Sequence, residues 1–171
     1  LVLRALQNFI GLRRCSIALT GAAPISTGIL EFFRTIGIPL VEVYGQTEST
    51  GVATAQPVED VRLGTVGVAV SGVEVTLGEH NEIIMRGGSM FKGYYKNDEA
   101  TASTLKDGWL HTGDVGEWRD GQLKIVDRLK DIMITAGGKN LSPTEIENTI
   151  KASPYIKECI VIGEARKYVS A

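Results

Sequence analysis

The 171-residue sequence predicts an α/β fold in three parts: the end of a βαβ layered-sheet domain, a small antiparallel β module and the start of a small α+β domain. The βαβ part is indicated by an order of strand, helix and strand within residues 15–44. The β module is indicated by short alternating segments that glycines interrupt after residue 63. The α+β part is indicated by a strong helix start at Ser142. We expect the boundaries 1–62, 63–126, 127–131 and 132–171, of which 127–131 is a connecting segment.

Composition and charge are those of a globular protein that buries a core. Hydrophobic residues make up 43% of the sequence and charged residues 22%, and both fractions are ordinary. The net charge of −2 offers no electrostatic basis for binding nucleic acid or an anionic membrane. No apolar run approaches the roughly 18 residues that span a bilayer. We therefore expect no transmembrane segment, and peripheral membrane contact stays open.

The two cysteines indicate the redox environment. Cys15 and Cys159 are far apart, each within an apolar run, so two buried free thiols are expected rather than a disulfide. This fits a reducing cytosol and a cytoplasmic protein. Residues 1–10 predict a helix that opens without a capping residue, so we expect the chain to be a piece of something longer.

Two loops of small residues interrupt the βαβ unit. The β-like runs 15–20 and 40–44 lead into the loops 21–24 and 45–48, and Ser26 or Thr27 can cap the helix between them. In parallel sheets, ligands bind beyond the carboxyl ends of the strands. The two loops would then flank one crevice, although both could equally be plain turns.

The later elements follow from alternation, turn residues and helix caps. His80 lies in a predicted turn and is expected to be exposed, without a site role. Pro143 suits the first helical position after a Ser142 cap, and Glu145 suits the capping box. The predicted elements are a hairpin of 73–77 and 82–86, a helix at 97–105, a hairpin of 115–118 and 122–126, a helix from 143 and a strand at 158–163.

The segment 109–140 carries most of the candidate chemistry. Asp114 could accept hydrogen bonds from sugar hydroxyls, and Arg128 could bind phosphate or ribose oxygens. Arg128 belongs to a cluster with four charges in the five positions 127–131. Spacing alone favours a simpler interpretation, which is a surface hairpin followed by a solvated charged segment.

These residues resemble the motifs of one enzyme family. Residues 44–48, Tyr-Gly-Gln-Thr-Glu, resemble the aromatic-Gly-x-Thr-Glu motif of AMP-forming acyl-CoA synthetases, whose superfamily includes luciferase and peptide-synthetase adenylation domains. Residues 109–114 resemble the family's Thr-Gly-Asp motif. Residues 127–147 resemble its hinge and the first loop of its mobile C-terminal domain. The sequence Thr-Ala-Gly-Gly-Lys-Asn at 135–140 most resembles that of the long-chain fatty acyl-CoA synthetases.

The resemblance implies a two-step ligase reaction. A carboxylic acid, expected to be a fatty acid, attacks ATP in the presence of Mg²⁺ and gives acyl-AMP and pyrophosphate. The C-terminal domain then rotates, and the thiol of coenzyme A takes the acyl group. Attack at phosphorus builds negative charge, which cations and amide donors stabilise.

The resemblance also implies roles for individual residues. Thr47 would offer its hydroxyl to the α-phosphate, Glu48 would bind Mg²⁺, and Lys130 would be the hinge. The implied ligand-binding residues are Gly21, Ala22 and Ala23 at the junction of adenine and acyl group, Tyr44, Gly45 and Gln46 beside adenine, Asp114 and Arg128 on the ribose or phosphate, and Gly137, Gly138 and Lys139 on the coenzyme A side.

Several alternatives remain open at this point. The family's phosphate-binding loop and its C-terminal catalytic lysine have no match here, so the fragment alone is expected to be inactive. Glu48 could be a surface carboxylate, Asp114 a turn cap, Arg128 an ion-pair partner and Lys139 a loop lysine. His111 is expected to be structural and Trp109 to be a core residue. The parent could also be an aryl- or medium-chain CoA ligase, a peptide-synthetase adenylation domain, or a binding or assembly module that kept the fold without activity.

Overall fold

The first sheet begins with the predicted βαβ unit. In the computed structural model, which describes residues 2–23, 25–138, 140–151, 153 and 155–171, helix α1 (Val2–Phe9) precedes this unit. β1 (Ala18–Thr20) and β2 (Leu40–Tyr44) pair in parallel, with Ala18 opposite Leu40. The first strand is shorter than the predicted 15–20, because the N–H of Cys15 donates to Leu12 and turns the chain there.

Helix α2 (Thr27–Thr35) connects the two parallel strands. The side chain of Ser26 accepts a hydrogen bond from the N–H of Ile29 and caps the helix, as one of the two predicted caps. Leu30 is fully buried on its inner face. Gly37 follows with φ of +86°, a conformation that a glycine adopts without strain.

The sheet continues in an antiparallel direction after β2. A 3₁₀ turn, η1 (Thr47–Ser49), leads to β3 (Thr54–Ala55), which pairs with both β2 and β4 (Val68–Ala69). The order is therefore β1-β2-β3-β4. Residues 68 and 69 thus complete the first sheet rather than the second one.

The second sheet is antiparallel throughout. β5 (Val73–Leu77), β6 (Glu82–Gly87) and the turn η2 (Glu79–Asn81) form the first predicted hairpin, and His80 is exposed as expected. Helix α3 (Asp98–Thr104) is capped by Asn97. β7 (Leu105–Lys106), β8 (Trp109–Arg119) and β9 (Gln122–Arg128) complete the sheet. The β8–β9 hairpin is longer than predicted, and a register shift interrupts it between Val115 and Gly116.

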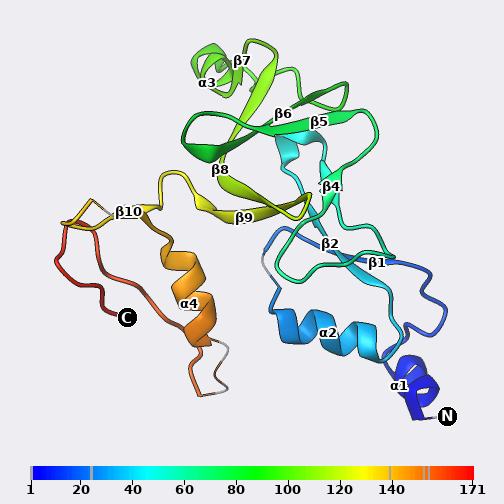
Figure 1. Cartoon of the computed structure of the whole chain (residues 1–171). Helices are drawn as coiled ribbons and strands as arrows, with labels where there is room; N and C mark the ends of the chain where they lie inside the picture. The colour runs from blue at the N-terminus through cyan, green and yellow to red at the C-terminus, as the bar shows by residue number, and fades with distance from the viewer. Residues whose placement is uncertain (1, 24, 139, 152, 154) are drawn as a thin grey trace.

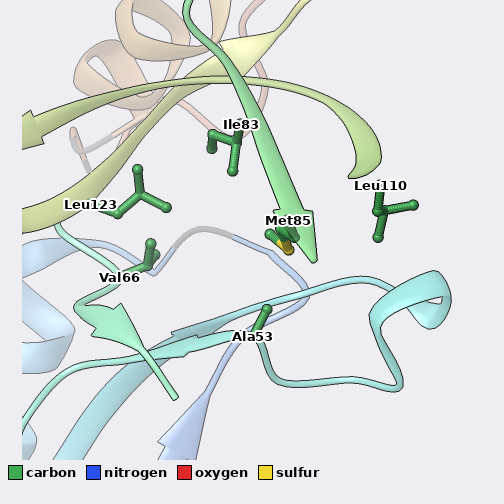
Figure 2. Close-up of a cluster of buried hydrophobic side chains, with 6 residues drawn as sticks. All are labelled: Ala53, Val66, Ile83, Met85, Leu110 and Leu123. Carbon is green, nitrogen blue, oxygen red and sulfur yellow. The ribbon is translucent and has the colours of Figure 1, made fainter. Parts of the chain in front are cut away.

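One hydrophobic cluster joins the two sheets (Figure 2). Ile83, Met85, Leu110 and Leu123 come from the second sheet and are fully buried. Ala53 and Val66 reach the same cluster from the segments beside β3 and β4. Burial of apolar surface therefore holds the two sheets together and fixes the junction where β2 and β8 meet.

The last part of the chain has its own small elements. β10 (Met133–Ile134) pairs with β11 (Asn140–Leu141), and α4 (Pro143–Lys151) follows. In Figure 1, α4 lies beneath β9, on the opposite side of the molecule from α1 and α2. The N–H of Glu145 donates to the side chain of Ser142, as expected for a capping serine.

The predicted strand at 158–163 is wrong. Only Ile162 forms a bridge, to Ser170, because a β-rich sequence becomes a strand only where a neighbouring segment completes a ladder. Val161 is nonetheless buried, and its N–H donates to Glu147. Cys15 and Cys159 are free thiols as predicted, but each is half-buried rather than buried. None of the helices in the described part of the chain is long and apolar enough to cross a membrane.

Candidate functional site

The structure brings the two small-residue loops to one cleft. The cleft has a volume of about 1230 Å³ and lies beyond the carboxyl ends of β1 and β2, where the second sheet approaches them. Gly21 and Ala22 line it from the first loop, and residues 44–48 line it from the second. Arg128 lines it from the end of β9. Ala23 is exposed and is not one of the lining residues.

Asp114 lies behind this lining as a buried hydrogen-bond acceptor. Its residue is 5% exposed. One carboxylate oxygen, Oδ2, accepts from the Tyr44 hydroxyl at 2.6 Å and from Nε2 of Gln46 at 2.9 Å. The other, Oδ1, accepts from Nη1 of Arg128 at 2.7 Å. Residues from β2, the following loop, β8 and β9 therefore converge on one carboxylate.

The strand pairing explains why these side chains meet. Asp114 on β8 is directly opposite Arg128 on β9 in the antiparallel register, and paired residues on one face of a sheet have adjacent side chains. The Asp114 hydrogen bond and charge raise the pKa of Arg128. Burial, followed by the charge of Asp114, raises the pKa of the Tyr44 hydroxyl. Tyr44 therefore stays protonated and remains a donor.

Arg128 keeps donors available for a ligand. Its side chain is 49% exposed, whereas that of Asp114 is 7% exposed. A guanidinium carries five N–H donors in a planar fork, and one of its nitrogens is bound to Asp114. The remaining donors of a cation held in this way can bind phosphate or ribose oxygens from within the cleft.

Glu48 and Thr47 occupy the η1 turn at the same cleft. Oε1 of Glu48 accepts a hydrogen bond from the Tyr94 hydroxyl at 2.7 Å, and this bond raises the pKa of Tyr94. No group of three or more potential metal-binding His, Cys, Asp or Glu residues occurs in the described part of the chain. A single carboxylate nevertheless fits Mg²⁺, which commonly takes one or two carboxylates together with phosphate oxygens and waters.

The glycine at position 45 is required by the protein's own backbone. A Cβ on Gly45 would lie 1.7 Å from the carbonyl oxygen of Gly51, so the β2–η1 backbone itself requires glycine there. Gly21 is similar, because its Cβ would approach the carbonyl of Val43 at 2.9 Å. These glycines pack the cleft walls tightly against each other, and close approach to adenine is not needed to explain them.

The cleft also contains residues to which the sequence pattern assigned no site role. Tyr94, Ser103, Thr104 and Lys106 form one side of it, around α3 and β7. Alternation and helix caps identify these elements only as scaffold. A further side, which carries Glu82 and His111, depends on the pairing of β6 with β8, and this contact between distant residues leaves no local signal in the sequence.

His111 contacts a neighbouring strand, and Trp109 lies outside the hydrophobic core, contrary to the expectation of a core residue. Nδ1 of His111 lies 2.7 Å from Oε2 of Glu82. The guanidinium of Arg86 stacks over the Trp109 ring at 4.5 Å from its centroid. Trp109 is half-buried at the sheet surface.

Arg128 and Leu129 of the connecting segment line the cleft, but the predicted residues that the structure describes after them do not. Lys130, Gly137 and Gly138 are exposed and are not among its lining residues. Lys139, the remaining predicted residue on the coenzyme A side, lies outside the described residues. The structure thus brings most of the predicted residues up to position 128 together at the cleft, and Lys130, Gly137 and Gly138 lie outside it.

A βαβ unit that passes into an antiparallel sheet, with a cleft at their junction, is the fold of adenylate-forming enzymes. The family model of the AMP-binding enzymes matches residues 4–95, and the model of the AMP-binding enzyme C-terminal domain matches residues 130–171. The chain therefore belongs to the AMP-binding enzyme family, as an adenylate-forming acyl-CoA synthetase sequence.

Three similar proteins illustrate the relationship. The fadD11 protein of Mycobacterium tuberculosis, a candidate fatty-acid–CoA ligase, is 45% identical over 100% of this chain and 30% of its own length. The long-chain-fatty-acid–CoA ligase FadD15 of Mycobacterium bovis is 37% identical, over 100% of this chain and 28% of its own. The O-succinylbenzoate coenzyme A synthetase of Bacillus subtilis, solved with ATP and magnesium ion, matches with a TM-score of 0.83 and 28% identity, over 98% of this chain and 38% of that chain. The chain thus spans about 30% of the length of the curated relatives that it matches.

Proposed function

We propose that this chain is the central part of an ATP-dependent fatty acid–CoA ligase. The parent enzyme would activate a carboxylate as acyl-AMP and then transfer the acyl group to coenzyme A. The single observation that carries the proposal is the buried carboxylate of Asp114, held by donors that line the cleft on which both glycine loops open. Family membership supplies the reaction class.

The Asp114 cluster accounts for nucleotide binding in this proposal. A carboxylate has about four lone-pair positions, and Tyr44, Gln46 and Arg128 engage three of them. One ribose hydroxyl would therefore donate to the remaining position, and a second would take the place of Gln46 or Tyr44, because both are neutral donors that a sugar hydroxyl can replace. Arg128 would keep its bond to Asp114 and bind ribose or phosphate oxygens with its free donors.

The η1 turn would hold the phosphates. The Thr47 hydroxyl would donate to the α-phosphate, and Glu48 would bind Mg²⁺ through its carboxylate. When bound there, Mg²⁺ would neutralise charge on the phosphate oxygens. Because Glu48 already accepts from Tyr94, its carboxylate is oriented at the cleft before the ion arrives.

The segment after β9 would belong to the mobile domain. We place the end of the large domain at residues 1–62, its β-rich subdomain at 63–126, the hinge at 127–131 and the start of the C-terminal domain at 132–171. Lys130 would absorb the backbone rotation between the two half-reactions. Gly137, Gly138 and Lys139 would approach coenzyme A after that rotation.

The proposed acid is a fatty acid, in line with the similarity to the fatty-acid–CoA ligases FadD15 and fadD11. An aryl acid is the second candidate, because the O-succinylbenzoate synthetase shares the fold over 98% of this chain. Two free thiols fit a reducing compartment, so we place the enzyme in the cytoplasm, with peripheral membrane contact left to experiment.

The test is an ATP–pyrophosphate exchange screen of the complete ligase over fatty, aryl and amino acids. We expect exchange that depends on a fatty acid, followed by thioester formation on addition of coenzyme A. Exchange with aryl or amino acids only would move the protein to another branch of the family. No exchange with any acid would contradict the proposed activity. For residues 1–171 alone, we expect no ATP binding by calorimetry at micromolar concentrations.

A further inference from the structure

Glu82 on β6 binds the irregular segment of β8 at residues 111–113, which directly precedes Asp114. Its carboxylate uses both oxygens: Oε1 accepts from the N–H of Gly113 at 2.9 Å, and Oε2 pairs with Nδ1 of His111 at 2.7 Å. Its side chain is 13% exposed. A nearly buried carboxylate therefore binds β8 at His111 and Gly113, on either side of Thr112.

These side-chain contacts matter because the backbone of residues 111–113 departs from regular strand geometry. Gly113 has φ of +70°, in the left-handed region. The pairing of β6 with β8 shifts register between Glu82 and Ile84, which lie opposite this segment of β8. The regular ladder is interrupted there, so side-chain hydrogen bonds must hold the backbone instead.

The same segment of β8 directly precedes Asp114 and contacts the connecting segment. The Thr112 hydroxyl donates to the carbonyl of Ile83 at 2.7 Å and accepts from the N–H of Asp114 at 3.1 Å. The carbonyl of Gly113 accepts from the N–H of Leu129 at 2.8 Å. A displacement of Gly113 would therefore move Asp114 on one side and the end of β9 on the other.

We propose that Glu82 is a positioning residue for the nucleotide site, which acts through Gly113 and His111 to fix the Asp114 carboxylate. Glu82 does not touch the reacting atoms in this scheme. It fixes residues 111–113 so that the Asp114 carboxylate is placed beside Tyr44, Gln46 and Arg128, in position for a ribose. The inference deepens the proposed function and rests on it.

Glu82→Ala in the complete ligase should raise the KM for ATP roughly tenfold, because the charge-assisted hydrogen bond from the Gly113 N–H and the contact with His111 are lost. The KM for the acid and for coenzyme A should change less than about twofold. Glu82→Gln keeps an oxygen that can accept from Gly113, so it should restore most of the ATP affinity. The matched control is Glu74→Ala, on the neighbouring strand β5, where the glutamate side chain is 63% exposed and pairs with Arg86; it should leave all three KM values unchanged.

A double-mutant comparison separates positioning from general damage. In an Asp114→Asn background, Glu82→Ala should have little further effect on the KM for ATP, because the group that it positions is already altered. Equal increases in all three KM values, or fully additive effects in the double mutant, would overturn the proposal. So would an ATP KM that stays within about twofold of wild type in Glu82→Ala.

Hydrogen–deuterium exchange gives a readout that needs no catalysis. A peptide that contains Gly113 should exchange roughly tenfold faster in Glu82→Ala and close to the wild-type rate in both Glu82→Gln and Glu74→Ala. Unchanged exchange in Glu82→Ala would overturn the positioning role even in an active enzyme. If Glu82→Ala speeds hydrogen–deuterium exchange but the wild-type enzyme shows no acid-dependent ATP–pyrophosphate exchange, the positioning role of Glu82 is supported and the proposed function is refuted separately.

Discussion

Asp114 and Asp127 are two buried carboxylates on the same strand pair, yet their partners come from different places. Asp114 on β8 is 5% exposed and Asp127 on β9 is 6% exposed. Asp114 accepts from the long side chains of Tyr44, Gln46 and Arg128 around the cleft. Asp127 accepts from the hydroxyls of Ser142 and Thr144 at 2.6 and 2.9 Å, in the segment that begins α4.

The difference separates a carboxylate arranged for a ligand from one that connects two parts of the chain. At the edge of a cleft, a sugar hydroxyl can replace the phenol or amide donor, and the guanidinium can bind a phosphate with its remaining donors. The donors to Asp127 include the backbone N–H groups of Arg128 and Thr144, at 2.8 and 3.2 Å; Arg128 lies within the connecting segment and Thr144 lies after it, in α4. Asp127 thus fixes α4 against β9 in this conformation.

The largest effect is expected at the connecting segment itself. If Lys130 is the hinge, α4 must leave Asp127 when the domain rotates, and the Asp114 cluster must stay in place. Proline fixes φ and removes an N–H, at a cost of about 3 kcal/mol or more where the backbone must adapt. Lys130→Pro should therefore slow transfer to coenzyme A roughly hundredfold while acyl-AMP formation stays largely intact.

Both half-reactions should be measured on the same preparation of that variant. Exposed Lys157, changed to proline, is a matched surface control outside the connecting segment. If Lys130→Pro slows both half-reactions equally, or neither, the rotation occurs elsewhere.

The next effect concerns the bonds between Asp127 and α4. Asp127→Ala removes several hydrogen bonds to a charged acceptor, and roughly 2 kcal/mol of docking free energy should be lost. Hydrogen–deuterium exchange of α4 should accelerate roughly thirtyfold, whereas the peptides around Asp114 should keep their protection. The exposed Asp131→Ala is the control. Unchanged exchange in α4 would show that Asp127 does not hold the helix.

A smaller loss of rate is expected for the ligand-facing carboxylate. Asp114→Ala should lower kcat/KM for ATP at least about tenfold, because hydrogen bonds to a charged group contribute roughly 1.5–3 kcal/mol each. The protection of α4 should not change, in contrast to Asp127→Ala. Normal ATP kinetics in a folded Asp114→Ala protein would remove Asp114 from the site.

The smallest effect is a pH dependence at Asp127. Burial raises the pKa of its carboxyl, but the hydrogen bonds from Ser142, Arg128 and Thr144 outweigh burial and leave the pKa below its ordinary value of 3.8. The docking of α4 should therefore be fully stabilised above that value and weaken as the pH falls through the lower folded-state pKa. The protection factor of α4, which is the exchange rate corrected for the intrinsic effect of pH, should stay constant from pH 6 to about pH 4 and fall below that, and this acid sensitivity should be absent from Asp127→Ala.

Local patterns in the sequence predict much of the scaffold. Strand–helix–strand order predicts the parallel pair β1–β2, and Ser26 and Ser142 predict where two helices begin. The same patterns do not distinguish a strand at 158–163 from a single bridge, because a ladder depends on a partner elsewhere in the chain.

The sequence predicts the site only in part. The motif resemblance identifies Tyr44, Asp114 and Arg128 individually, and the structure joins them in one network. It does not reveal Glu82, because its bonds to His111 and Gly113 span about thirty residues and depend on the register of β6 with β8. The strand pattern alone does not distinguish Asp114 from Asp127, since both are acidic residues within a strand pair. The motif resemblance assigns a ligand role to Asp114 only, and the three-dimensional partners of the two carboxylates differ.

The most direct test is ATP–pyrophosphate exchange by the complete ligase with a fatty acid, measured for wild type, Asp114→Asn and Asp127→Asn. We expect exchange that depends on the fatty acid in the wild type, a loss of at least about tenfold in kcat/KM for ATP in Asp114→Asn, and a smaller change in Asp127→Asn. Absence of acid-dependent exchange in the wild type, or equal losses in the two variants, would contradict the assignment of the Asp114 cleft as the nucleotide site of an acyl-CoA ligase.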